Sequence, residues 1–456
     1  MSGFDVLVRG GTVVAQDGMV DADVGILDGR IAAIEPELEG GGAVEIDASV
    51  LVVLPGAVDA HVHLNEPGRA EWEGFFTGTA ALAAGGTTCA IDMPLNAIPP
   101  TLDGPSFDAK VAAAAGNAHV DIALWGGLVP GDLDRLDELA ARGVVGFKAF
   151  MSASGVPEFA AADDLTLIEG MARAAGLGLP VAVHAESDAL TAALARRAVA
   201  AGRTTVADYL ASRPVVAELE AIGRAITFAA ETGCALHVVH VSSGRGVALV
   251  AEARAGGVDV TCETCPHYLA LDAHDAERLG AIAKCAPPLR AAVVVEELWE
   301  RLLAGDVDLV ATDHSPSPAE SKETGADHFA AWGGISGAQT LLMVLHDAGV
   351  VARGLAMEHL ASLTAEVPAL RFGLSPAKGA LTLGADADLA LLDPTTTWTL
   401  DRDDLLDRHR LSPFAGRRLH GRIVRTLLRG QTIALDGRLT GTPPAGRVLR
   451  RGGGMA

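Results

Sequence analysis

The sequence predicts an α/β protein in which a (β/α)8 barrel of the TIM type is joined to a small β-sandwich built from both chain termini. Three observations predict this fold. The chain has 456 residues, more than one compact core usually holds. Its middle alternates apolar strand-like runs with Ala- and Leu-rich helical stretches, which is typical of a parallel sheet. Both ends show short strands separated by Gly and Asp turns.

The two ends of the chain resemble each other in their pattern. FDVLVRGGTVV and ADVGILDGRIAAIE near the N-terminus alternate apolar and polar residues, as do DADLALLDP and RIVRTLLRGQTIALDG near the C-terminus. We therefore expect residues 1–55 and 373–456 to form the two halves of the β-sandwich and residues 56–372 to form the barrel.

The middle of the chain contains eight apolar runs of strand character, each followed by a helical stretch. Eight strand–helix units are the number that a closed barrel requires. Polar residues stand late in most of these runs, where barrel enzymes place their chemistry. The runs cover residues 56–63, 85–94, 120–128, 144–151, 179–186, 235–243, 258–268 and 307–316.

Composition excludes several classes of protein. The net charge of −23 argues against a nucleic-acid partner, because phosphate contacts need clustered Lys and Arg. No uninterrupted apolar run reaches membrane-spanning length. The five cysteines show no disulfide framework, and Cys262-x-x-Cys265 lacks the second pair of a zinc knuckle, so we expect it to serve packing. These features predict a cytoplasmic enzyme that acts on a small molecule.

Six polar residues stand at the ends of five predicted strands. A barrel brings these ends to one mouth, although about 250 positions separate the first from the last. Imidazole and carboxylate groups suit Zn²⁺ or a similar divalent metal, and their number suffices for two ions. The six residues are His61, His63, Lys148, His184, His240 and Asp313.

Lys148 is the most informative of the six. It lies in VVGFKAFM, where apolar neighbours make a charged ammonium unfavourable and lower the pKa of the amine. A neutral amine reacts with CO₂, and the resulting carbamate is an anion that can bridge two cations. Each residue taken singly also has a simpler explanation: a salt-bridged lysine, core histidines, and an Asp313 that caps a turn. Their joint occurrence at five strand ends favours a metal site.

Several segments extend this pattern over almost the whole chain. DAHVHLNEPGR, GFKAFM, HVVHVSSGRG, TCETCPHYL, KCAPPLR and ATDHSP resemble the cyclic amidohydrolases of the amidohydrolase superfamily, a group that includes allantoinases, hydantoinases, dihydropyrimidinases and dihydroorotases. The resemblance implies that His61, His63 and Asp313 hold one metal and that His184 and His240 hold the other. It also implies an N6-carboxylated Lys148 as the bridge, Zn²⁺, Co²⁺, Fe²⁺ or Mn²⁺ as the metals, and a homotetramer.

The same resemblance implies a mechanism and a set of substrate contacts. A hydroxide bridging the two metals would attack a ring carbonyl, with Asp313 acting first as general base and then as general acid. Backbone and side-chain groups of the loops at the barrel mouth would orient the ring. The substrate-binding residues that we expect are Asn65, Asn96, Cys285, Ser315 and Gly334.

The segment around Asn65 bears on the substrate. Dihydroorotases of the most similar type carry an arginine at this position, which clamps a carboxylate. Asn65 offers a neutral amide instead, although it could also serve only to cap the loop. NEPGRAEWEGF (65–75) and DMPLNAIPPT (92–101) match allantoinases. The predicted reaction is therefore the opening of allantoin to allantoate in purine degradation, with a hydantoinase or dihydropyrimidinase, then a dihydroorotase, then a non-catalytic relative as alternatives.

Overall fold

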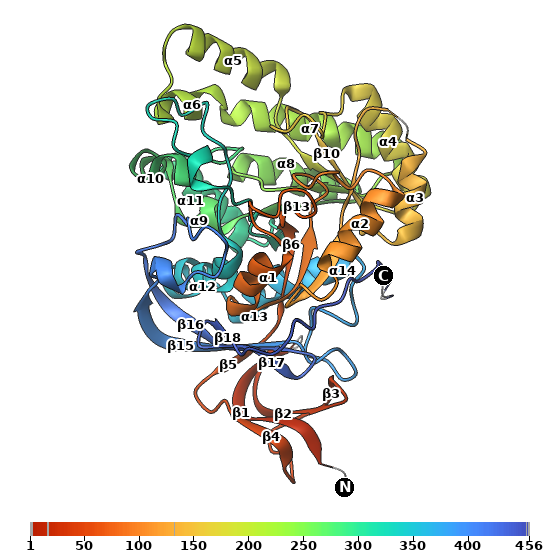
Figure 1. Ribbon diagram of the computed structural model, residues 1–456, viewed down its shortest axis with the longest axis vertical. Coiled ribbons are helices and arrows are strands. Elements are labelled where there is room, and N and C mark those ends of the chain that lie inside the picture. The colour runs from red at the N-terminus through yellow and green to blue at the C-terminus, as the bar shows by residue number, and fades with distance from the viewer. Residues whose placement is uncertain (1–2, 16–17, 132, 453, 455–456) are drawn as a thin grey trace.

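A computed structural model of the chain describes residues 3–15, 18–131, 133–452 and 454. The predicted fold class is confirmed: a β/α barrel stands on a sandwich domain to which both ends of the chain contribute (Figure 1). The first and last residues of the predicted sandwich, 1 and 456, lie outside the described residues. Among the described residues, no helix has both the length and the apolar character that crossing a membrane requires.

The barrel consists of short parallel strands whose side chains, apart from the half-buried Thr261, are buried. Their order is β6-β7-β8 and then β9-β10-β11-β12-β13-β14. β8 and β9 are two parts of one strand that is interrupted at Trp125. The barrel closes where the N–H of His63 donates to the carbonyl of His314 at 2.7 Å. The strands are β6 (Ala57–Val62), β7 (Thr87–Asp92), β8 (Asp121–Leu124), β9 (Gly126–Gly127), β10 (Phe147–Phe150), β11 (Val181–His184), β12 (Leu236–Val238), β13 (Val260–Thr264) and β14 (Leu309–Val310).

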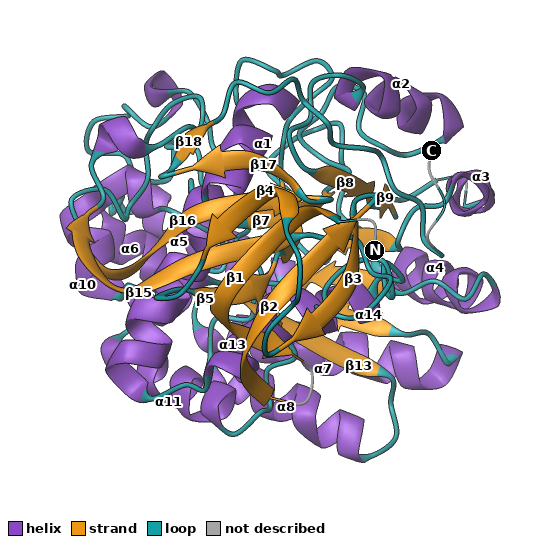
Figure 2. Ribbon diagram, turned by 90° about the horizontal axis from the view of Figure 1, so that it is seen from below, coloured by secondary structure: helices purple, strands orange, loops and turns teal. Residues whose placement is uncertain are grey.

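Helices surround these strands on the outside (Figure 2). Several begin at side-chain caps, such as Asp103, which accepts a hydrogen bond from the N–H of Ser106. The α-helices are α1 (Phe75–Ala84), α2 (Gly104–Ala114), α3 (Arg135–Arg142), α4 (Asp164–Gly176), α5 (Asp188–Ala200), α6 (Val206–Ser212), α7 (Val215–Thr232), α8 (Gly244–Ala255), α9 (Pro266–Ala270), α10 (Ala273–Leu279), α11 (Ala292–Leu303), α12 (Leu341–Leu345), α13 (Met357–Ala361) and α14 (Val367–Arg371). Shorter 3₁₀ or π turns are η1 (Gly280–Ala283), η2 (Ala319–Ser321), η3 (Ala338–Thr340), η4 (His346–Val351), η5 (Ser362–Glu366) and η6 (Arg402–Asp404).

The sandwich domain is one nine-stranded sheet in the order β18-β17-β16-β15-β5-β1-β2-β3, with β4 beside β1. The antiparallel pair β5–β15 joins the N-terminal half to the C-terminal half. β1 pairs with both β4 and β5, because it carries a bulge between Val8 and Gly11. The strands are β1 (Phe4–Ala15), β2 (Gly18–Leu27), β3 (Arg30–Glu35), β4 (Gly42–Asp47), β5 (Val52–Pro55), β15 (Leu389–Thr399), β16 (Arg418–Leu428), β17 (Gln431–Leu435) and β18 (Arg438–Leu439).

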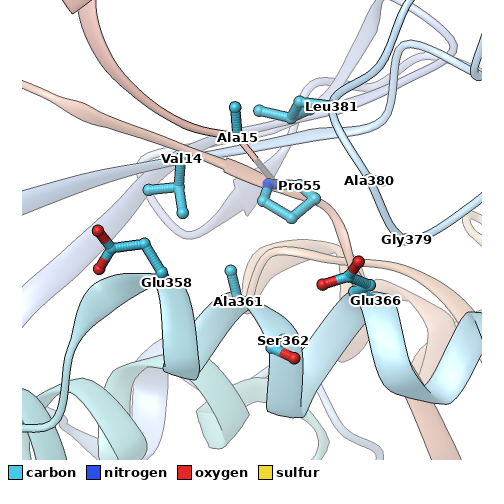
Figure 3. A pocket seen from close by; sticks show the side chains of 10 residues that line it. All are labelled: Val14, Ala15, Pro55, Glu358, Ala361, Ser362, Glu366, Gly379, Ala380 and Leu381. Atoms are coloured by element: carbon cyan, nitrogen blue, oxygen red, sulfur yellow. The ribbon is translucent and has the colours of Figure 1, made fainter. Parts of the chain in front are cut away.

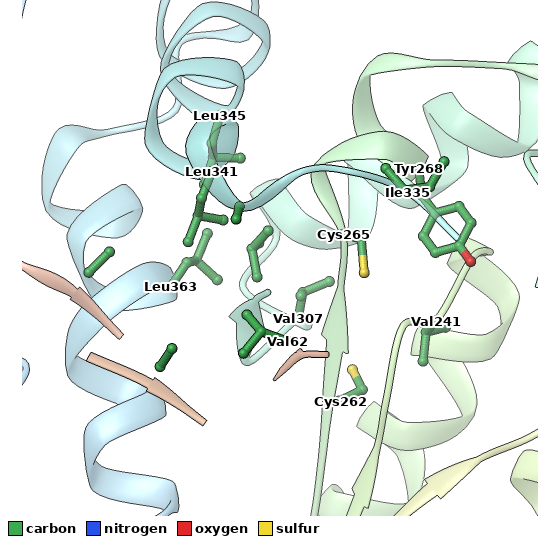
Figure 4. Packing of buried hydrophobic residues seen from close by; sticks show 14 of the residues in the cluster. Val62, Val241, Cys262, Cys265, Tyr268, Val307, Ile335, Leu341, Leu345 and Leu363 are labelled. Atoms are coloured by element: carbon green, nitrogen blue, oxygen red, sulfur yellow. The ribbon is translucent and has the colours of Figure 1, made fainter. Parts of the chain in front are cut away.

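The main hydrophobic core lies between the barrel strands and the helices around them. Val62 from β6 packs in the same buried cluster as Leu341 and Leu363 from the helical segments after β14 (Figure 4). Cys262 and Cys265 belong to this cluster, and both are free thiols. Burial raises the pKa of each thiol well above its ordinary value, so the Cys-x-x-Cys segment serves packing, as the sequence predicts.

A buried cluster of charges joins the barrel to the sandwich. Lys378, in the connection from α14 to β15, contacts three carboxylates: its Nζ lies 2.5 Å from Asp121 of β8, 3.0 Å from Asp386 and 2.7 Å from Asp388. Arg429, between β16 and β17, also contacts Asp121 at 2.5 Å. Nearby, a small crevice of about 40 Å³ lies between β1, β5, the helix α13 and the turn η5 (Figure 3).

The replacement Lys378→Met should destabilise the protein strongly. It would leave the buried Asp388 without its counter-charge and Asp121 with Arg429 alone, which costs about 3–5 kcal/mol in the free energy of unfolding. Urea unfolding followed by circular dichroism would measure the effect. The control Arg142→Met removes an exposed ion pair to Asp108 and should change that free energy by less than about 1 kcal/mol. Equal effects of the two replacements would show that the buried cluster does not hold the domains together.

Candidate active site

The predicted ligand residues lie at the carboxyl ends of the barrel strands. His61 is in β6 and His63 follows directly after it, while Asp313 follows β14. The Nε2 atoms of His61 and His63 lie 3.2 and 3.4 Å from one oxygen of Asp313. The ligand atoms of these three residues all lie within 4.8 Å of one another, and all three side chains are largely or fully buried. They form the first of two groups that the fold assembles from distant segments.

The second group comes from the next strands of the barrel. His184 is the last residue of β11, and His240 follows β12 by two residues. The Nδ1 atom of His184 lies 3.0 Å from the Nε2 atom of His240. The rings of His61 and His240 are 5.5 Å apart, so the two groups adjoin. Imidazole nitrogens that converge in this way are suited to share one cation.

Lys148 lies in β10 and has no access to solvent. Its Nζ has no hydrogen-bond partner among the described residues and lies 4.9 Å from the centre of the Phe150 ring. Burial lowers the pKa of the amine to about 7, although Glu263 and Asp313 oppose the shift. A buried amine without a partner is rare, because it loses its hydration without compensation. This orphaned atom and the donor set around it fit a site for divalent cations with an anionic group between them.

The electrostatics of the first group also fit a cation site. Burial alone would raise the pKa of Asp313, but His61 and His63 outweigh it and hold that pKa well below its usual range. Burial lowers the pKa of His63, of His184 and, more strongly, of His240. His63, His184 and His240 are therefore neutral and the Asp313 carboxylate is charged at neutral pH, which are the forms that bind metal.

Several predicted site residues have an unusual backbone conformation. Eight non-glycine residues among the described ones have a positive φ angle, and four of them are predicted site residues. Non-glycine residues in this region are uncommon, and they concentrate at functional sites that the surrounding structure holds in place. The four are Asn65 (φ 62°), Asn96 (φ 47°), His240 (φ 40°) and Asp313 (φ 45°).

A cavity of about 430 Å³ opens above the ligand residues. Five of the six predicted ligands line it, and Lys148 does not. Of the predicted substrate contacts, Asn96, Cys285, Ser315 and Gly334 line it as well. Gly334 has a φ of 144°, and a Cβ atom there would lie 2.0 Å from the carbonyl oxygen of Ser315. A side chain at Gly334 would thus distort the cavity wall.

Asn65 differs from the other predicted substrate contacts in its position. It is buried, does not line the cavity, and both polar atoms of its side chain lack a hydrogen-bond partner among the described residues. Its backbone carbonyl accepts a hydrogen bond from the N–H of Arg69, which closes the NEPGR turn. Asn65 therefore lies at the start of this turn, outside the lining of the cavity.

Three glutamates that sequence reasoning missed support the ligands from behind. Glu263 of β13 contacts Nδ1 of His61 at 2.5 Å and Nε2 of His237 at 3.1 Å. Glu186 contacts Nε2 of His184 at 2.9 Å and pairs with Arg213. Such carboxylates orient a ligand imidazole and fix its tautomer. Glu186 and Glu263 could have been found in the sequence as charged residues within apolar strand-like runs, which is the same feature that indicates Lys148.

The third glutamate, Glu73, contacts His314, the residue that follows Asp313. Glu73 is fully buried and lies 3.3 Å from Nε2 of His314. The other ring nitrogen of His314 accepts hydrogen bonds from the N–H groups of Gly337 and Ala338. Glu73 is itself held by the backbone N–H of Arg408, in the segment between β15 and β16. His314 thereby ties the loop of Asp313 to the start of the turn η3. His267 is the remaining histidine that interacts electrostatically with Asp313 and His61. It is buried, and burial lowers its pKa to about 4.

Comparison with known proteins agrees with this geometry. The model of the amidohydrolase family matches residues 52–433. The chain is 62% identical to an allantoinase of Rubrobacter xylanophilus, over 99% of this chain and 98% of that one. It is 54% identical to an allantoinase of Solibacter usitatus, over 98% and 97%.

A solved structure gives the same result for the fold. The L-hydantoinase (dihydropyrimidinase) from Arthrobacter aurescens superimposes with a TM-score of 0.96 at 38% identity, covering 98% of this chain and all of the other. The resemblance inferred from the sequence is thus confirmed along the whole chain. The chain belongs to the amidohydrolase family, among its allantoinase-type cyclic amidohydrolases.

Proposed function

We propose that this enzyme hydrolyses the hydantoin ring of allantoin to give allantoate. The observation that carries the proposal is the set of converging imidazole and carboxylate groups at the floor of a cavity large enough for a small cyclic amide. The similarity to allantoinases across nearly the whole chain supports this choice of substrate. The reaction adds water across a ring amide, so that the C–N bond breaks and the ring opens.

Two divalent cations are the cofactors that the residues fit. His61, His63 and Asp313 would hold one, and His184 and His240 the other. Zn²⁺, Co²⁺, Fe²⁺ and Mn²⁺ all accept these ligands. Cations bound here would supply Lewis acidity, which lowers the pKa of water and polarises a carbonyl.

Lys148 would complete the site as a carbamate. Its neutral amine attacks the carbon of CO₂, a C–N bond forms, and one proton leaves to solvent. The product would replace a buried amine without a partner among the described residues by an anion with two oxygens, a type of ligand that divalent cations accept. The lowered pKa of Lys148 supports this step, because it makes the reactive neutral amine abundant near neutral pH.

Asp313 would move the proton in the reaction. Its carboxylate lies at the cavity floor and is ionised at neutral pH, so it can accept a proton from the attacking water. It then donates that proton to the ring nitrogen, which is a poor leaving group as an anion. The Nε2 atoms of His61 and His63 lie 3.2 and 3.4 Å from this carboxylate, which places it beside the cation that they would hold.

A hydantoinase or dihydropyrimidinase activity is the second candidate, favoured by the close superposition on a solved L-hydantoinase. A carboxylate-bearing substrate is less favoured. Arg213 lines the cavity, but its guanidinium is paired with the buried Glu186. Arg69 is paired with Glu158 and hydrogen-bonds the carbonyl of Asn96. The cytoplasmic location and the homotetramer stay predictions, and the five free cysteines are consistent with a reducing compartment.

A side-by-side assay tests the substrate. Metal-loaded protein would be offered allantoin, hydantoin, dihydrouracil and dihydroorotate, and product formation would be measured. We expect kcat/KM for allantoin to exceed the others by about tenfold or more, because the cavity must hold the ureido arm as well as the ring. A preference for hydantoin or dihydrouracil would replace the proposal by the second candidate. Chelation of the metal should abolish all turnover, and added Zn²⁺, Co²⁺ or Mn²⁺ should restore it.

The replacement Lys148→Ala tests the carbamate. We expect the variant to bind less than the full complement of metal and to lose activity by about a hundredfold or more, because the bridging anion is missing. Acetate or propionate should restore part of both, since a small carboxylate can occupy the vacated space. Metal content by atomic emission and activity would be measured together. Full metal binding and activity without added carboxylate would contradict the bridge.

The replacement Asp313→Asn tests the proton transfer. An amide cannot accept and return a proton, so kcat should fall by about 10²–10⁴-fold. Solvent isotope effects and metal content would be measured on the same preparation. If the metal content is kept and kcat barely changes, Asp313 serves only as a ligand.

A further inference from the structure

The chain contains only five lysines among its 35 basic residues, and none of them is an ordinary exposed lysine. Four are buried, and Lys322 is half-buried. Lys110 and Lys378 pair with carboxylates, and Lys148 belongs to the proposed metal site. Lys284 and Lys322 remain, and neither forms an ion pair with a carboxylate in the described part of the chain. Their ammonium groups bind backbone carbonyls instead.

Lys284 follows the turn η1 and lines the cavity. Its Nζ donates to the carbonyl oxygens of His328 at 2.7 Å, Phe329 at 3.1 Å and Ala331 at 2.5 Å. All three N–H groups of the ammonium can therefore be satisfied by one short stretch of backbone. The Tyr209 ring lies beneath the same ammonium, with its centre 4.7 Å from Nζ.

Lys322 follows the turn η2 and acts on the next part of the same stretch. Its Nζ donates to the carbonyl oxygens of Trp332 at 3.2 Å and Gly334 at 3.0 Å, and to that of Ala281 at 3.2 Å. The last contact ties the stretch to η1, beside Lys284. The two lysines together bind five carbonyls of residues 328–334.

Residues 329–334 all line the cavity, and we call residues 328–334 the cavity wall. A trans peptide directs its C=O and the following N–H in opposite directions. A lysine that binds the carbonyl of Trp332 therefore also sets the direction of the N–H of Gly333. The wall contains Gly333 and Gly334 and has no regular secondary structure, so its shape depends on such contacts.

We propose that Lys284 and Lys322 are positioning residues that hold the cavity wall in its substrate-binding shape through charge-assisted hydrogen bonds to its carbonyls. The inference rests on the proposed function only in assigning this cavity to the substrate. Binding of the substrate depends on both ammonium groups, whereas the metal ligands lie on other segments and do not. Loss of either charge should therefore raise KM much more than it lowers kcat.

The charges around the two lysines make the wall sensitive to pH. Burial, with smaller contributions from Arg213 and Lys322 and against the opposing effect of Asp327, lowers the pKa of Lys284 to about 8. Burial lowers the pKa of Lys322 to about 8 as well, and Cys285 opposes it. The ammonium forms are therefore present below pH 8 and are lost above it. A neutral amine has two N–H donors, so it cannot satisfy three carbonyls.

The other titratable groups around the two lysines change their protonation state in other pH ranges. Burial lowers the pKa of His328 to about 4, and Lys284 and Lys322 add to the shift. Burial raises the pKa of Tyr209 and of Cys285, each to about 12. Of the groups that face the two ammonium groups, only the lysines themselves lose a proton between pH 7.5 and 9.5 by these values.

The experiment compares Lys284→Met and Lys322→Met with the charge-conserving Lys284→Arg and Lys322→Arg. The substrate is whichever cyclic amide the wild-type enzyme opens fastest. At pH 7.5 we expect each Met variant to raise KM by about tenfold or more, with kcat within about threefold and metal content unchanged. Hydrogen–deuterium exchange should be faster in residues 328–334 of the Met variants, and the Arg variants should recover part of both effects.

The pH profile separates positioning from a merely structural role. In the wild-type enzyme KM should rise between pH 8 and 9.5, and in the double variant Lys284→Arg/Lys322→Arg this rise should disappear, because Arg stays charged. The matched control Arg278→Met removes one exposed positive charge from α10, the helix before η1, and should change neither KM nor its pH profile.

Three results would overturn the inference: a KM that is unchanged in both Met variants, a loss of metal that accounts for their defect, or an alkaline rise in KM that survives in the double Arg variant. If the Met variants do not fold, the pH dependence of KM in the wild-type enzyme and in the double Arg variant still tests the inference. A wild-type enzyme that prefers another cyclic amide to allantoin would refute the proposed function but leave this test intact, because the variants are compared on the preferred substrate.

Discussion

Closure of the barrel is the constraint on which the site depends. The hydrogen bond from the N–H of His63 to the carbonyl of His314 joins the first strand to the last, across some 250 positions of sequence. It places Asp313 against His61 and His63 at hydrogen-bonding distance. Neither group of ligands exists in any local segment, so the site forms only when the whole barrel does.

The strained conformations at the site have the same origin. His240 and Asp313 adopt positive φ angles immediately after short parallel strands, where the chain leaves the barrel. Such conformations persist only where many contacts over-determine them. Glu263 provides one contact to the backbone N–H of His240 and another to His61. The supporting carboxylates therefore stabilise the backbone that carries the ligands as well as the ligands themselves.

The sequence predicted the fold class and the residues that now lie together at the cavity floor, because strand periodicity and late polar residues are local signals. It did not predict the contacts of irregular segments. Residues 446–451 run back along the barrel and hydrogen-bond β8 and the end of α3, and Arg408 reaches Glu73. These segments have no periodic pattern that would indicate their partners. Glu186 and Glu263 were missed for a related reason, since one carboxylate in a strand does not reveal which imidazole it contacts.

The use of lysine and arginine in this chain follows from their acidities. Arginine stays charged in any environment, whereas burial can lower the pKa of a lysine into the physiological range. A buried lysine therefore takes its character from what surrounds it. Lys378 has three carboxylates, and they raise its pKa despite burial. Lys284 has three carbonyls, which satisfy its N–H groups but carry no full charge, so its pKa falls to about 8. Lys148 has no hydrogen-bond partner in the described part of the chain and a pKa of about 7, which leaves much of it as a free amine. One residue type thus provides a fixed charge, a charge that responds to pH and a largely neutral amine, and the surrounding oxygens decide which.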